Sequence, residues 1–156
     1  MIKEGKLEEL ASSYKFFKKS TSALTEEDSN FAPKEGMMTV AQQVAHVAQT
    51  FDWFMEGAFD PNGFSMDFEG AAAEVKKYDS LQRAQAYLDE AYEKCRSIVA
   101  SKTDEELSAK LKDERIMGPA PVFAVINATI EHTAHHRGSL AVYTRMLDKV
   151  PPMPYM

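Results

Sequence analysis

Hydrophobic residues recur at helical spacing in four long stretches of the chain, which predicts four amphipathic helices. The first three stripes are Leu7, Leu10, Tyr14, Phe17 and Leu24; then Val40, Val44, Val47, Phe51 and Phe54; then Leu81, Ala84, Leu88, Ala91, Cys95 and Ile98. The fourth helix is expected to open after Pro119 and Pro121 and to run to about Lys149, where Pro151 and Pro152 stop it.

Helix starts are marked by polar residues at capping spacing. Thr39 and Gln42 form a T-x-x-Q capping box at the start of the second helix. Asp79 and Gln82 are placed to cap the third. A further capping box, Thr103 with Glu106, predicts a short helix from Thr103 to Lys112.

No segment alternates between apolar and polar residues as a strand does, so the pattern predicts an all-α protein. Four long helices in one domain spanning residues 1–156 favour a four-helix bundle. The connection from Gly57 to Asp79 shows no sustained period and is expected to be a long loop. It carries Phe64, Met66 and Phe68, which either form a lid or binding loop or tuck beneath the helices.

Composition narrows the class of protein. The 156 residues are 44% hydrophobic and 27% charged, close to globular averages, and no apolar run is long enough for a membrane span. A single cysteine, Cys95, excludes a disulfide framework, and we expect a cytoplasmic protein with no membrane partner. The formal charge of −6 and the absence of a basic cluster predict that nucleic acid is no partner either.

Histidine provides the candidate chemistry. Three of the four histidines lie at His132, His135 and His136, and the fourth is His46 on the second helix. On a helical wheel of about 100° per residue, His132 and His136 lie about 40° apart at the edge of the apolar arc, whereas His135 leans toward solvent. His46 lies beside the apolar arc of its own helix. Imidazoles at i and i+4 can share one metal ion, so His132 and His136 are the preferred pair, with His132 and His135 as the other option.

The residues flanking these histidines are mixed polar and aromatic. Gln43, Thr50 and Trp53 lie near His46, and Tyr143 lies on the last helix. Such a set suits the wall of a partly open cleft, which makes these four residues candidates for binding a substrate. The alternative interpretation is that Trp53 and Tyr143 are ordinary aromatics at the edge of the core.

Two motifs resemble the DinB-like (DinB/YfiT) superfamily over nearly the whole chain. One runs from Leu24-Thr25-Glu26-Glu27-Asp28 through Phe31-Ala32-Pro33 to Met38-Thr39-Val40-Ala41-Gln42-Gln43-Val44-Ala45-His46-Val47. The other is His132-Thr133-Ala134-His135-His136-Arg137-Gly138, followed by Leu140, Tyr143-Thr144-Arg145 and Pro151-Pro152. The resemblance implies a four-helix bundle, often dimeric, in which His46, His132 and His136 hold one divalent metal ion.

The activity implied by the resemblance is less uniform than the fold. Some members of the family are similar to thiol-dependent S-transferases or maleylpyruvate isomerases that use low-molecular-weight thiols. Three neutral imidazoles leave a coordination position open, which is typical of catalytic sites, and both zinc and nickel suit imidazole. We therefore expect a metal-dependent enzyme acting on a small molecule, as a thiol S-transferase or a hydrolase. The alternative is a non-catalytic protein that binds metal or a small ligand and has a stress-related role.

Three further expectations concern particular side chains. His135 is the one candidate near the predicted ligands for a catalytic acid or base, with an exposed surface histidine as the other interpretation. Tyr14, Phe16 and Phe17 offer more aromatic surface than one helix stripe needs, which favours a homodimer. Arg137 falls inside the apolar arc, so its guanidinium should either reach solvent or meet a carboxylate, such as Asp52 or Glu56.

Overall fold

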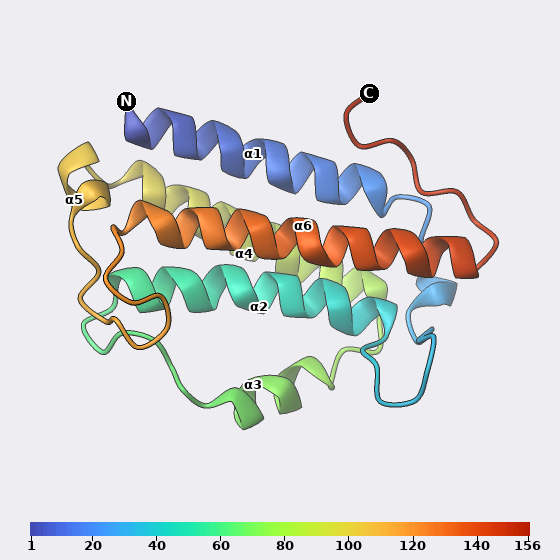
Figure 1. The fold of residues 1–156 in the computed structure, drawn as a ribbon. Helices are drawn as coiled ribbons and strands as arrows, with labels where there is room; N and C mark the ends of the chain where they lie inside the picture. The colour runs from blue at the N-terminus through green and yellow to red at the C-terminus, as the bar shows by residue number, and fades with distance from the viewer.

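The computed structural model describes all residues 1–156 and contains helices but no β-strand. Figure 1 shows α1, α2, α4 and α6 lying side by side, with α3 outside them against α2. None of these helices is long and apolar enough to cross a membrane. The helical elements are α1 (Ile2–Ser20), η1 (Glu26–Asp28), α2 (Val40–Phe59), α3 (Phe68–Val75), α4 (Leu81–Ala100), α5 (Asp104–Ser108) and α6 (Phe123–Met146).

The four predicted long helices are present, and both capping boxes form. At the start of α2, the backbone N–H of Gln42 donates to Thr39 Oγ1 over 3.2 Å, and Gln42 Oε1 accepts from Thr39 N over 3.0 Å. The cap of α4 is Ser80, whose Oγ accepts from Arg83 N over 3.2 Å, one residue later than the sequence pattern placed it. The short helix α5 ends at Ser108 and α6 ends at Met146, both earlier than predicted.

The core lies where the predicted apolar stripes meet. α2 is central, because it packs against both α4 and α6, while α1 covers the opposite side of α4 and α6. Side chains from all four helices are fully buried there, among them Leu10, Phe17, Phe51, Leu88, Ile126 and Leu140. Cys95 belongs to this core and is 1% exposed, so it packs as a small apolar residue.

The connection between α2 and α4 differs from the sequence prediction, because it contains the helix α3. Asp67 caps this helix, its Oδ1 accepting from Gly70 N over 2.8 Å. A helix of eight residues is too short to show a sustained period in the sequence, and only Val75 of its side chains is buried. Helix-forming alanines and the cap favour the helix, and its short apolar stripe is Phe68, Ala71, Ala72 and Val75. Of the three apolar residues expected in this segment, Phe64 is buried, whereas Met66 and Phe68 are exposed.

The aromatic residues of α1 are used within the chain. Phe17 is buried, and Tyr14 stacks on Tyr92 of α4 with ring centroids 3.9 Å apart. Phe16 meets the ring of Tyr155, in the C-terminal tail, edge-on at 5.0 Å. These residues therefore leave little aromatic surface for a second copy of the chain. A homodimer stays a prediction, but the aromatic residues of α1 no longer support it.

Candidate metal centre and its cavity

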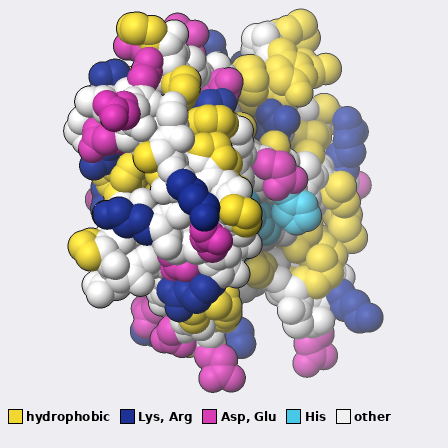
Figure 2. All heavy atoms as spheres, turned by 60° about the vertical axis from the view of Figure 1, so that its left-hand side comes forward, with side chains coloured by type: hydrophobic (Ala, Val, Ile, Leu, Met, Phe, Trp, Pro, Cys, Tyr) yellow, Lys and Arg dark blue, Asp and Glu magenta, His cyan; other side chains and the backbone are white.

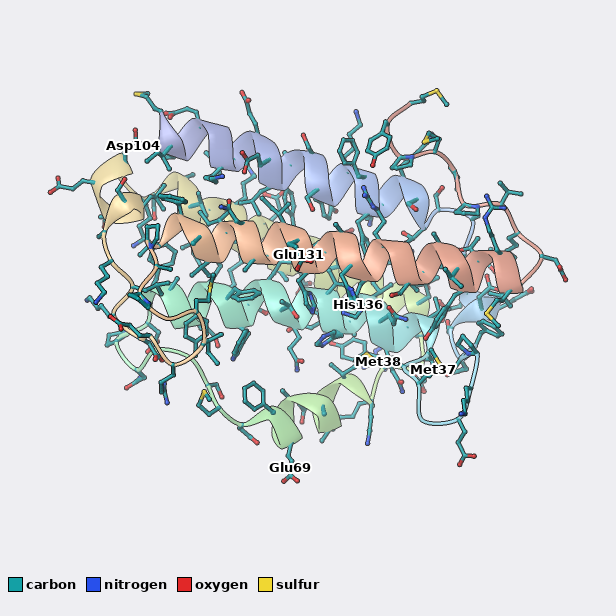
Figure 3. The ribbon with its side chains drawn as sticks, in the orientation of Figure 1. Met37, Met38, Glu69, Asp104, Glu131 and His136 are labelled. Atoms are coloured by element: carbon teal, nitrogen blue, oxygen red, sulfur yellow. The ribbon has the colours of Figure 1, made fainter.

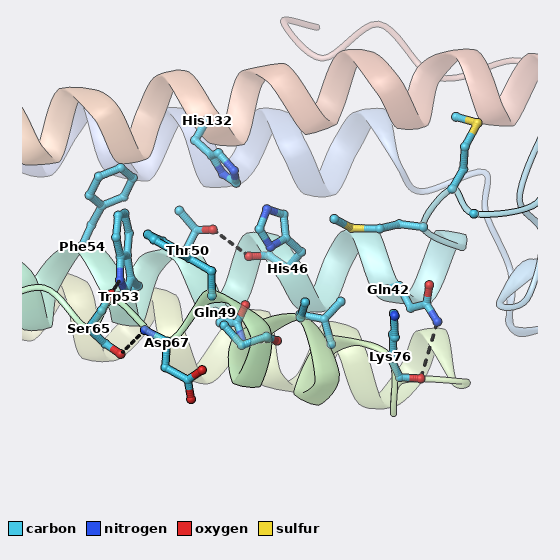
Figure 4. Close-up of a pocket in the computed structure, with 17 residues that line it drawn as sticks. Gln42, His46, Gln49, Thr50, Trp53, Phe54, Ser65, Asp67, Lys76 and His132 are labelled. Atoms are coloured by element: carbon cyan, nitrogen blue, oxygen red, sulfur yellow. Dashed lines mark hydrogen bonds between the residues drawn. The ribbon is translucent and has the colours of Figure 1, made fainter. Parts of the chain in front are cut away.

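Three histidines from two helices come together between α2 and α6. His46 projects from α2, and His132 and His136 project from consecutive turns of α6. Each residue offers one ring nitrogen such that these atoms lie within 4.8 Å of one another. The imidazole centroids are 4.5–4.9 Å apart. Figure 3 shows His136 directed from α6 toward α2, and Figure 4 shows His46 and His132 facing each other from the two helices.

Burial keeps all three imidazoles neutral. It is the main cause that lowers the pKa of His132 to about 4 and that of His136 to about 3, and the neighbouring histidines lower both further. The pKa of His46 is also lowered by burial, with a side-chain contact to Gln49 acting in the opposite direction. Neutral imidazole is the form that carries a free lone pair for a metal ion, so the cluster is ready to bind one at neutral pH.

The hydrogen bonds of the cluster fit a metal ion as the missing partner. His132 Nδ1 is buried and has no hydrogen-bond partner among the protein atoms. His136 Nδ1 lies 2.8 Å from Gln43 Oε1, and because an amide oxygen can only accept, this nitrogen carries the proton. The other nitrogen of His136, Nε2, then keeps its lone pair. Such an outer hydrogen bond is the usual way in which a metal-binding histidine is oriented.

A cavity of about 750 Å³ opens beside the histidines. His46 and His132 line it, whereas His136 lies behind them and is 8% exposed. Thr50 and Trp53 of α2 also line the cavity, and residues of α3 form its outer wall (Figure 4). Figure 2 shows histidine side chains reaching the molecular surface among apolar and acidic neighbours. A molecule in the cavity would therefore lie against two of the three clustered imidazoles.

Comparison with models of known protein families identifies the family of this chain. The model of the DinB superfamily matches residues 10–140. The chain belongs to the DinB superfamily. A comparison with curated proteins gives no match.

Solved structures share this fold at low sequence identity. A DinB-like protein from Bacillus cereus ATCC 10987 is 18% identical, with a TM-score of 0.76 over 96% of this chain and 95% of that one. A DinB-like protein from Bacillus subtilis is 16% identical, with a TM-score of 0.68 over 95% of each chain. The colibactin self-resistance protein ClbS, in complex with double-stranded DNA, is 13% identical, with a TM-score of 0.69 over 92% of this chain and 95% of that one. These likenesses establish the fold, and the ClbS complex does not fit the expectation from charge that nucleic acid is no partner.

The other residues predicted for the site of this DinB-superfamily chain lie at different depths. Gln43 is buried behind the cavity and contacts His136, and Tyr143 is buried and donates its hydroxyl to Met38 O over 3.0 Å. Neither side chain lines the cavity. His135 is exposed, with its ring centroid 6.5 Å from that of His132, and it is not among the three clustered histidines.

Arg137 does not meet the carboxylates proposed for it. Its guanidinium lies 5.8 Å from the ring centroids of both Phe16 and Tyr155, on the side of α6 that faces α1. Asp52 of α2 instead accepts a hydrogen bond from Lys94 of α4 over 2.7 Å. The half-buried charge is therefore placed over aromatic rings, an arrangement that depends on the C-terminal tail folding back over α1.

Sequence reasoning did not find the wall formed by α3. The sequence of α2 does contain a signal for this wall. Four residues spaced at i, i+4, i+7 and i+11 share one face of the helix: Gln42, His46, Gln49 and Trp53. All four line the cavity. A polar and aromatic stripe that runs beside the apolar stripe of the same helix indicates a second surface to be covered.

Proposed function

We propose that His46, His132 and His136 hold one divalent metal ion, and that the protein is a metal-dependent enzyme acting on a small molecule. The observation that carries the proposal is the group of three imidazoles whose ligand nitrogens lie within 4.8 Å of one another, with two of the three rings, those of His46 and His132, at the wall of the 750 Å³ cavity. Membership of the DinB superfamily supports it. The all-imidazole donor set suits zinc or nickel.

The residues present favour a catalytic site over a structural one. Structural zinc sites are closed by four protein ligands and are usually rich in cysteine, whereas here three histidines and no cysteine would hold the ion, which would leave it able to bind a further ligand. A bound divalent ion would supply Lewis acidity, lowering the pKa of a water or thiol that reaches it. Gln43 would hold the proton on His136 Nδ1 throughout, and the aromatic wall around Trp53 would limit access of bulk water.

Two reaction classes use this chemistry, transfer of a low-molecular-weight thiol and hydrolysis of a small molecule. Both need a nucleophile generated at neutral pH beside an enclosed substrate. The competing function is binding of a metal or small ligand without turnover. Turnover by the metal-loaded protein of a thiol with an electrophile, or of an activated ester, separates the enzyme from the binding protein.

The metal centre is tested first by elemental analysis of protein prepared without a histidine tag. We expect close to one divalent ion per chain, and metal content well below that in His46→Ala, His132→Ala and His136→Ala. The matched control is His135→Ala, which removes an exposed imidazole from the same helix and should keep the metal. Equal metal content in all four variants would show that the ligand assignment is wrong.

A further inference from the structure

The lining of the cavity is apolar in its larger side chains. Trp53 and Phe54 contribute rings whose centroids are 5.0 Å apart, and Phe68 lies 6.2 Å from Trp53. Phe68 and Met37 both line the cavity while remaining 55% and 46% exposed. Large apolar side chains left open to water around a cavity lose that exposure when an apolar ligand enters, which favours binding of such a ligand.

Charge in the lining is confined to the two ends of α3. Asp67 precedes the helix and Lys76 follows it, and no arginine lines the cavity. The carboxylate of Asp67 is used as the helix cap, accepting from Gly70 N over 2.8 Å. Lys76 is exposed. A ligand with several carboxylate or phosphate groups would therefore meet one cationic side chain besides the proposed metal ion.

Most of the polar side chains in the lining are already bonded within the protein. Three of them fasten the α3 segment to α2: Gln42 Nε2 donates to Lys76 O over 3.5 Å, Gln49 Nε2 to Ala71 O over 2.9 Å, and Trp53 Nε1 to Ser65 O over 2.8 Å. The hydroxyl of Thr50 donates to His46 O over 2.8 Å. These groups hold the wall in place, and a ligand does not have to satisfy them.

We propose that this cavity binds an uncharged, predominantly apolar molecule built on an aromatic ring, with a single donor atom for the metal ion. The ring lies between Trp53 and the face of α3, and the donor points toward His46 and His132. The volume of about 750 Å³ is in the range of sites for drug-sized ligands. The position of the donor rests on the metal centre proposed above, whereas the preference for an aromatic body rests on the lining alone.

The preference for an aromatic body is tested by ¹⁹F NMR of 4-fluoroanisole, a neutral aromatic compound, added to the metal-free protein. If the compound binds, its ¹⁹F signal should broaden in the presence of the parent protein. In Ala72→Phe, which places a ring at the cavity wall, the affinity should fall about tenfold or more. Ala73→Phe is the matched control, because Ala73 is the next exposed alanine of α3 but does not line the cavity. No binding by the parent protein, or equal binding by all three proteins, would overturn the proposal.

With metal bound, the proposal is tested on two neutral ligands, 1-benzylimidazole and 1-methylimidazole, which share one donor nitrogen. 1-Benzylimidazole should bind about tenfold or more tightly than 1-methylimidazole, because it buries a ring as well. The chain has one tryptophan, Trp53, so its fluorescence reports occupancy of the cavity directly. Equal affinities would overturn the proposal while leaving the metal centre intact. If the parent protein holds no metal, the proposed function fails, and the result with 4-fluoroanisole still decides the aromatic preference.

Discussion

The hydrogen bond between Gln43 and His136 joins α2 to α6 and fixes the proton on His136 Nδ1. Its two atoms are 2.8 Å apart, and both residues are buried, at 5% and 8% exposure. The substitution Gln43→Met keeps the length of the side chain but removes the acceptor. His136 Nδ1 then has no protein partner in a buried site.

Two magnitudes follow from this geometry. A buried polar group left without its partner costs about 1–2 kcal/mol, which for a chain of this length lowers the melting temperature by about 3–6 °C. Loss of the orienting hydrogen bond also allows the other tautomer, in which Nε2 is protonated and cannot bind a metal ion. Loss of such an outer hydrogen bond typically weakens metal binding about 10–100-fold.

The assay is a competitive titration of zinc at pH 7 against a chromogenic chelator, paired with thermal unfolding of the metal-free protein. Gln85→Met is the control, since Gln85 is half-buried on α4 and takes no part in the histidine cluster. The control should match the parent in zinc affinity. If Gln43→Met binds zinc as tightly as Gln85→Met does, then Gln43 does not position His136 and the reasoning is refuted.

Three other predictions concern the rest of the chain. Burial raises the pKa of the Cys95 thiol to about 12, so at pH 8 a disulfide labelling reagent should react only as fast as the protein unfolds, and rapid labelling without denaturant would contradict this. Burial raises the pKa of Asp28, but hydrogen bonds from Lys149 and from Thr25 outweigh burial and leave that pKa below its usual value. In the unfolded chain the Asp28 carboxyl binds its proton at a higher pH than in the folded chain. The carboxylate therefore stabilises the fold fully above about pH 4, and this stabilisation is lost as the pH falls through the lowered pKa. Lys149→Met should therefore lower the free energy of unfolding by about 1 kcal/mol at pH 7, with a smaller difference below pH 4; a constant difference from pH 7 to pH 2 would argue against the pairing. Arg137→Met should keep the metal and lower stability by about 1 kcal/mol, measured by denaturant unfolding, and lost metal would place Arg137 in the site.

The sequence alone determined the helical framework and the ligand set predicted for the metal. Apolar side chains at helical spacing must be buried on one face, so Val40, Val44 and Leu88 mark the core without knowledge of their partners. The capping box at Thr39 is equally local, because its atoms lie within one turn. His132 and His136 are one turn apart on one helix, and His46 is the one other histidine beside an apolar arc, so the helical wheel could select these three.

The tertiary structure decided everything that depends on which side chains meet across helices. The partner of His136 is Gln43, 93 positions away, and no spacing rule connects them. The placement of Arg137 depends on Tyr155 returning from the C-terminal tail. The cavity exists because Gln49 and Trp53 fasten α3 over the histidine face of α2, and the short apolar stripe of α3 does not show which helix it faces. Hydrophobic periodicity in a sequence indicates which side chains are buried against a core. A cavity wall remains partly in water, so periodicity does not place it. The position of this wall is set by long-range hydrogen bonds that form only in the folded chain.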